Sequence, residues 1–172
     1  MLLYLSCLAQ NKLPSVQLDS AKLKEFNNYI KWSYNYGSQK EFDSTARYSK
    51  RAIDLAKELK DDNLLAHAKA CAAHTLYWQL RTKEARHLLN ENIASKTIED
   101  SILFNTYMLF GEIDIYEREF KSGANQLIEA EKLIETKGIN TKRDSSEYVA
   151  LNISYAELYK GCLLYTSPSP RD

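Results

Sequence analysis

Apolar side chains recur at three- and four-residue intervals along most of the chain, with polar side chains between them. This spacing is typical of amphipathic helices, which make about 3.6 residues per turn. Glycine and clusters of polar residues interrupt it. We therefore predict helices at about residues 20–36, 41–59, 64–80, 83–94, 98–116, 120–136 and 145–160.

The interruptions predict how these helices begin and end. Gly37 and Gly138 are placed as helix ends, since glycine adopts the left-handed conformation common there. Asp144 and Glu147 have the spacing of a capping box at the start of the last helix. Gly161 then falls where we expect a short turn.

A pattern of small residues recurs within the helical segments. A small residue on one helix is followed nine positions later by the start of a second helix, which carries another small residue three positions further on. The copies are Ser33, Phe42 and Thr45; Ala73, Thr82 and Ala85; and Gly111, Phe120 and Gly123. The steps between copies are 40 and 38 residues, and Ser154 opens a fourth copy after 43. A fixed internal offset with variable outer spacing indicates one helix hairpin, repeated.

These hairpins resemble tetratricopeptide repeats. That family carries a small residue at the eighth position of its first helix, then an aromatic residue and two small residues on its second helix. Gly111, Phe120, Gly123 and Ala130 match all four positions, whereas Thr82 and Asn92 depart from the pattern. The longer step and the missing proline at the end of each repeat resemble divergent bacterial members. Other helix-pair solenoids remain open as an alternative.

The resemblance covers residues 19–161 and implies an all-α fold. We expect a right-handed α-solenoid of about three and a half stacked antiparallel hairpins, since a hairpin cannot bury its apolar face alone. The fourth hairpin lacks its second helix, so we expect self-association through this uncapped C-terminal helix.

The two ends of the chain differ from the repeats. Residues 1–18 resemble the remnant of a signal peptide and a leader, with small residues Cys7 and Ala9 before a candidate cleavage point. A frayed helical turn is the alternative. Residues 162–172, CLLYTSPSPRD, resemble the translation of a sequencing adapter, so we treat them as a non-native or disordered tail.

The amino-acid composition mainly excludes classes of function. Lys plus Arg equals Asp plus Glu at 23 each, which argues against a nucleic-acid or anionic-membrane surface. No apolar run approaches the roughly 20 residues needed to span a bilayer. Cys71 is the one cysteine within the repeats, so cysteine usage does not indicate a redox compartment.

The first helix of each hairpin is expected to line a concave face, according to the resemblance. Its predicted ligand- or peptide-binding residues combine aromatic area with polar tips. They are Tyr34, His74, Trp78, Asn105, Glu112, Tyr116, Asn152, Tyr155 and Tyr159. The alternative is that several of these tyrosines pack between adjacent hairpins.

Reactive side chains form no recognisable catalytic pattern. His67, Cys71 and His74 share one helix face, but a fourth metal ligand is not visible. The acidic residues Glu112, Asp114, Glu117 and Glu119 are expected on solvated faces. No phosphate-binding glycine loop or nucleophile motif occurs. We therefore expect no enzyme activity, no cofactor and no metal.

The sequence thus predicts a non-catalytic module that binds a protein or peptide. By resemblance, such a module is the sensory or interaction region of a larger bacterial signalling protein, exported to the periplasm or cell envelope. The alternatives are an envelope assembly scaffold and an accessory protein that holds a small molecule or metal. If residues 1–18 are not a signal peptide, the expected location is the cytoplasm.

Overall fold

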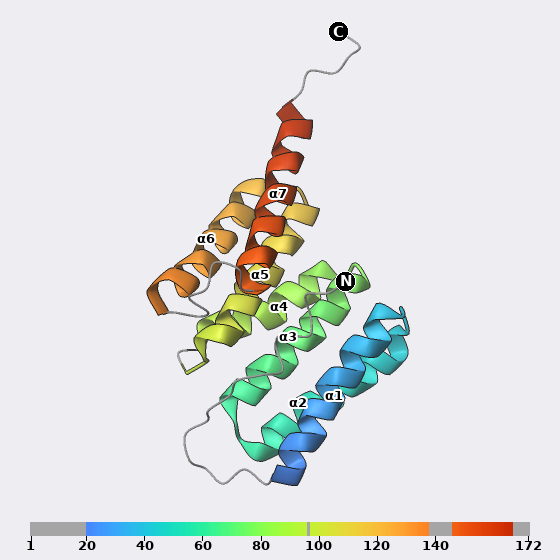
Figure 1. The fold of residues 1–172 in the computed structure, drawn as a ribbon. Helices are drawn as coiled ribbons and strands as arrows, with labels where there is room; N and C mark the ends of the chain where they lie inside the picture. The colour runs from blue at the N-terminus through green and yellow to red at the C-terminus, as the bar shows by residue number, and fades with distance from the viewer. Residues whose placement is uncertain (1–19, 96, 138–145, 167–172) are drawn as a thin grey trace. The chain divides into compact units, whose positions relative to one another are not determined.

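The computed structural model describes residues 20–95, 97–137 and 146–166, and the regular elements in these ranges are α-helices (Figure 1). The prediction of an all-α fold is confirmed. The helices are α1 (Ser20–Ser38), α2 (Phe42–Leu59), α3 (Asp62–Trp78), α4 (Thr82–Ala94), α5 (Asp100–Tyr116), α6 (Phe120–Lys137) and α7 (Ser146–Thr166). The predicted leader at 1–18, the cap at Gly138 and the capping residue Asp144 lie outside the described residues.

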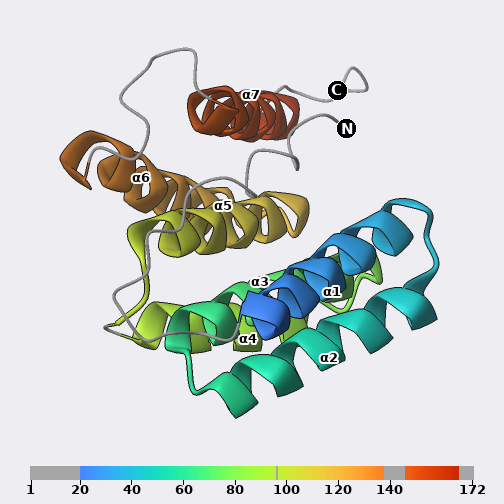
Figure 2. The same cartoon turned by 60° about the horizontal axis from the view of Figure 1, so that its bottom comes forward.

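The described chain divides into two compact units, residues 20–106 and 107–166. In the first unit α1 packs on α2, α2 on α3 and α3 on α4, and α3 also contacts α1 (Figure 2). Its core includes Phe26, Ile30, Leu64 and Cys71, which come from α1 and α3. In the second unit α7 packs on α6, and the fully buried side chains include Ile113, Leu127 and Leu151.

The turns α1–α2, α3–α4 and α5–α6 share one geometry. Each connection spans three residues: 39–41, 79–81 and 117–119. The middle residue has a positive φ of 59–64° in every case, although none is glycine: Lys40, Leu80 and Arg118. The amide of the next residue donates to the carbonyl five positions earlier, at 2.8–2.9 Å. The turns recur at the 40- and 38-residue steps of the sequence pattern, so one hairpin geometry is repeated.

Small residues meet across the hairpins, as the pattern predicts. The Ser33 hydroxyl donates to the Thr45 carbonyl at 3.3 Å across α1 and α2. A β-carbon added to Gly123 would stand 3.3 Å from the Gly111 carbonyl oxygen, so the α5 and α6 backbones approach closely there. Small side chains at these crossings allow helix axes to come near one another.

Two glycines lie inside helices where the sequence predicts helix ends. Gly37 lies within α1, which continues to Ser38. The residue is buried because the indole of Trp78 packs against its backbone. Gly161 lies within α7, which continues to Thr166, and the ring of Phe120 packs against it. The helix predicted to end at Gly37 ends one residue later, at Ser38. The prediction of a turn at Gly161 was wrong, because α7 continues through this residue and the Phe120 ring packs against it.

Helix α7 carries apolar side chains on two opposite faces. Leu151 and Leu158 are buried, whereas Val149, Ile153 and Leu163 are exposed. A helix that is apolar all round is usually covered on all sides. The outer face of α7 is therefore a candidate contact surface.

Candidate functional site

Three predicted site residues form one aromatic group in the first unit. The rings of His74 and Trp78 on α3 lie 4.5 Å apart and nearly perpendicular, at 73°. Tyr34 on α1 meets both rings edge-on, with centroids 6.0 Å from His74 and 6.4 Å from Trp78. Tyr34 and Trp78 are half-buried, and His74 is buried. The structure thus joins the first two hairpins through predicted site residues.

The position of this aromatic group depends on small and polar residues beneath it. A β-carbon at Gly37 would stand 2.6 Å from Cε3 of Trp78, so only glycine leaves room for the indole. Ser33 and Ser49 are 2.7 Å apart between α1 and α2, and Ser49 lies 3.4 Å from the Thr75 hydroxyl on α3. These buried hydroxyls are hydrogen-bonded, so they align the helices without an unsatisfied polar group.

Of the candidate metal ligands, Cys71 and His74 are buried and His67 is half-buried. His67 contacts the ring of Phe26 at 6.0 Å, and Cys71 belongs to the core. Burial lowers the pKa of His67 and of His74 to about 4, and burial raises the pKa of the Cys71 thiol to about 11. All three are therefore neutral at pH 7. No cluster of three or more His, Cys, Asp or Glu within the described ranges could hold a metal ion.

A second group of predicted residues lies on α7. Tyr155 and Tyr159 stack with centroids 6.4 Å apart and ring planes 28° apart. The Tyr155 hydroxyl donates to Oε2 of Glu131 on α6 at 2.8 Å. Burial, the Glu131 hydrogen bond and the nearby negative charges of Glu131 and Glu135 raise the pKa of Tyr155. Tyr155 therefore bridges α6 and α7, while Tyr159 is 65% exposed.

The remaining predicted residues of the second unit differ in exposure. Glu112 is half-buried, and burial together with the Glu157 carboxylate raises its pKa to about 7. Asp114 is fully buried, so the expectation of a solvated acidic face was wrong for this residue. Tyr116 and Asn152 are exposed. Asn105, in the first unit, is also exposed.

The nine predicted residues thus belong to two units. Tyr34, His74 and Trp78 make one group, and Tyr155 and Tyr159 make another.

Sequence reasoning missed a further aromatic group between α1 and α2. Tyr36 and Tyr48 stack at 5.5 Å with nearly parallel planes, and Trp32 lies 5.1 Å from Tyr48. The Arg51 guanidinium lies 5.9 Å from the Tyr29 ring and 5.7 Å from the Tyr48 ring. The three- and four-residue spacing of these aromatics was the available signal. Helical geometry puts them on the flank of α1 opposite Tyr34 and α3.

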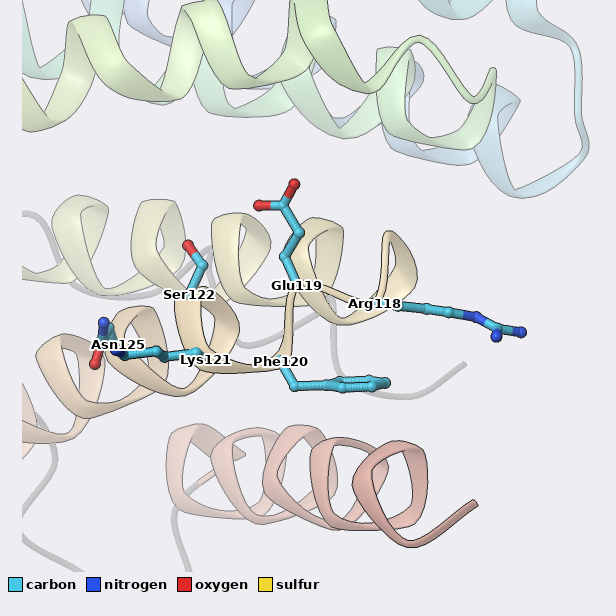
Figure 3. A pocket seen from close by; sticks show the side chains of 6 residues that line it. All are labelled: Arg118, Glu119, Phe120, Lys121, Ser122 and Asn125. Atoms are coloured by element: carbon cyan, nitrogen blue, oxygen red, sulfur yellow. The ribbon is translucent and has the colours of Figure 1, made fainter. Parts of the chain in front are cut away.

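Depressions in the described parts of the units include one between α3 and α4 and one at the α5–α6 turn. A cavity of about 110 Å³ between α3 and α4 has a mixed lining that includes apolar Leu65 and Ile98 and a 2.7 Å ion pair between Lys69 and Glu91. An open depression of about 560 Å³ surrounds the α5–α6 turn (Figure 3). There Phe120 points toward α7 and Glu119 points to the opposite side. The cavity between α3 and α4 is too small for a peptide. The depression at the α5–α6 turn is lined only by that turn and the start of α6.

None of the described helices is both long and apolar enough to cross a membrane. Comparison with known protein families, with curated proteins and with solved structures finds no match to this chain.

Proposed function

We propose that this chain is a non-catalytic helical-repeat module that binds a protein or peptide. The observation that carries the proposal is the group of Tyr34, His74 and Trp78, which spans two successive hairpins. Aromatic side chains with polar tips offer contact area and hydrogen bonds together, and they dominate protein-binding surfaces. Tyr34 and Trp78 are half-buried, so they keep exposed area for a ligand, while buried His74 supports them.

The repeated hairpin supports the same proposal. The three turns within the hairpins share one geometry, as expected for a repeat protein that resembles a tetratricopeptide-like solenoid. Such arrays present extended surfaces built from one helix of each repeat. On this basis we assign exposed Tyr116, Asn152 and Tyr159, with Glu112 and Tyr155, to a peptide-binding surface of the second unit. Exposed Asn105 is assigned to a binding surface of the first unit.

We extend the proposal to the biological setting that the resemblance implies. The chain is then the sensory or interaction region of a larger bacterial signalling protein that is exported to the cell envelope. Recovery of the complete gene tests this extension. A kinase or DNA-binding segment encoded downstream supports signalling, whereas further repeats followed by a stop codon support an envelope scaffold.

Selection from a displayed peptide library tests binding itself. Peptides enriched on the wild-type chain are expected to lose at least roughly tenfold affinity for Tyr34→Ala or Trp78→Leu, because such anchors carry most of the energy of an interface. Trp32→Ala is the matched control, since Trp32 is 41% exposed on the opposite flank of α1. Circular dichroism checks that the variants remain helical. Failure to enrich any peptide, or equal loss in the control, contradicts the proposal.

A further inference from the structure

The α6–α7 pair carries a stacked tyrosine pair next to two carboxylates. Tyr155 and Tyr159 are one helical turn apart on α7, with centroids 6.4 Å apart. The Tyr155 hydroxyl donates to Glu131 at 2.8 Å, and the negative charge of Glu135 also acts on Tyr155. Glu131 and Glu135 are likewise one turn apart on α6. The described surroundings of these rings are therefore both aromatic and anionic.

The register of the two helices orders this surface. Gly161 meets Phe120 and Tyr155 meets Glu131, so α7 runs antiparallel to α6. Exposed Ile128 on α6 and exposed Tyr159 on α7 add apolar area to this helix pair. A long side chain with an apolar stem and a charged head matches a surface that combines apolar area with carboxylates.

The first unit contains a similar tyrosine pair with a cation beside it. In the first unit Tyr29 and Tyr48 stack with centroids 6.2 Å apart and planes 29° apart, close to the 6.4 Å and 28° of Tyr155 and Tyr159. The Tyr29 hydroxyl donates to the Glu25 carboxylate, as Tyr155 does to Glu131. The Arg51 guanidinium lies within 5.9 Å of both ring centroids of the Tyr29–Tyr48 pair. A tyrosine pair with a carboxylate thus accepts a guanidinium in this protein.

We propose that the surface formed by Glu131, Glu135, Tyr155 and Tyr159 binds an arginine side chain of the partner protein. The guanidinium stacks on the tyrosine rings through a cation–π interaction and donates to the Glu131 carboxylate, while its alkyl stem lies toward Tyr159. A carboxylate has about four acceptor positions, so Glu131 can accept from Tyr155 and from a guanidinium together. This inference rests on the proposed function, because it names the chemistry of the partner.

The planar guanidinium fits this surface better than a spherical cation. It stacks on an aromatic face and presents several parallel N–H donors to a carboxylate, whereas a quaternary ammonium has no donor. We therefore expect arginine to be preferred over tetramethylammonium, and the positive charge to be required.

Binding of small probes tests the surface apart from the whole module. Nα-acetyl-arginine methylamide is titrated into the full chain while the ring signals of Tyr155 and Tyr159 are followed by NMR. We expect saturable shifts with an affinity in the millimolar range. The uncharged citrulline derivative, which has the same shape, is expected to bind at least roughly fivefold more weakly. Equal binding of arginine and citrulline, tighter binding of tetramethylammonium, or no shift of either tyrosine overturns the assignment.

Variants locate the site. Glu131→Gln and Tyr159→Leu are each expected to weaken the arginine probe at least roughly threefold, since each removes one interaction. Glu129→Gln is the matched control, because Glu129 lies on the same helix and pairs with Lys132 at 2.6 Å. Loss in the control equal to that in Glu131→Gln overturns the site.

The two proposals fail in different ways. If library peptides bind with no need for arginine and tolerate Glu131→Gln, the peptide-binding function stands and the arginine site is wrong. If the arginine probe binds at Tyr155 but no peptide is enriched, the site stands and the peptide-binding function is wrong.

Discussion

The indole of Trp78 packs directly against the backbone of Gly37, two residues that belong to different hairpins. A β-carbon at position 37 would stand 2.6 Å from Cε3 of Trp78 and 2.9 Å from Cη2, and the ring carbon between them is nearer still. The contact anchors α3 on α1 and fixes the aromatic group of Tyr34, His74 and Trp78.

Gly37→Ala is expected to destabilise the protein by about 1–3 kcal/mol, because the added methyl group displaces the indole. Helix propensity alone predicts the opposite sign, since alanine is favoured over glycine inside a helix by about 1 kcal/mol. Denaturant unfolding measures the change. In a Trp78→Ala background the same substitution should become neutral or stabilising, and destabilisation that persists there would show that Trp78 is not the cause.

Glu112 is expected to make stability depend on pH. Its pKa rises to about 7 in the folded protein, because of burial and the Glu157 carboxylate, so the fold favours its protonated form. The stabilising contribution is full below the unfolded-state pKa of about 4.3 and is lost as pH rises through about 7. Glu112→Gln should therefore gain on the order of 1–3 kcal/mol relative to wild type between pH 5 and pH 8.

The comparison with wild type at each pH isolates this effect. Burial lowers the pKa of His67 and of His74 to about 4. Their contributions to the stability of the fold are therefore lost as pH falls from about 6.5 toward 4, whereas the contribution of Glu112 is lost as pH rises. The histidine contributions are common to both proteins and cancel in the difference. A difference that stays constant between pH 5 and pH 8 would contradict the assignment to Glu112.

Cys71 is expected to resist thiol reagents in the folded protein. It is 1% exposed, and burial raises its thiol pKa to about 11, so the reactive thiolate is scarce. In a Cys7→Ser, Cys162→Ser background, alkylation at pH 8 should be slower by roughly 10³-fold or more than in denaturant. Mass spectrometry follows the reaction. Modification in native buffer as fast as in denaturant would show that the α1–α3 core opens readily.

The outer face of α7 is expected to drive self-association. Val149 and Ile153 are 45% and 46% exposed and lie one turn apart. Burying them against a second copy removes apolar area from water, so the protein should form dimers or larger species as concentration rises. Analytical ultracentrifugation of the Val149→Gln, Ile153→Gln double variant should show a shift toward monomer. Trp32→Gln is the control, and a wild-type chain that stays monomeric at high concentration contradicts the prediction.

The sequence predicted the helices well, because their signals are local. The segment predicted at 41–59 is α2 at 42–59, and the segment predicted at 120–136 is α6 at 120–137. Repeated small residues such as Gly111 and Gly123 also predicted where the helices of a hairpin approach. The helical periodicity lies within one helix, and the small-residue pattern joins two helices that follow one another in the sequence.

Features that depend on distant residues were missed. Gly37 has the usual properties of a helix end, and its role inside α1 depends on Trp78 in the next hairpin. The hydrogen bond of Tyr155 to Glu131 could not be predicted, because it depends on the register of α7 against α6. The stacking of Tyr29 on Tyr48 likewise required the pairing of α1 with α2.

The uniform three-residue turns within the hairpins determine where this chain tolerates an insertion. At Lys40, Leu80 and Arg118, as at Lys60 between α2 and α3, the backbone reverses through one left-handed residue, so an insertion there would break this geometry. The links from one hairpin to the next vary, from residues 60–61 between α2 and α3 to residues 95–99 between α4 and α5. A fluorescent reporter or an affinity tag grafted into the chain therefore belongs at 95–99, where natural spacing already differs, and away from 79–81.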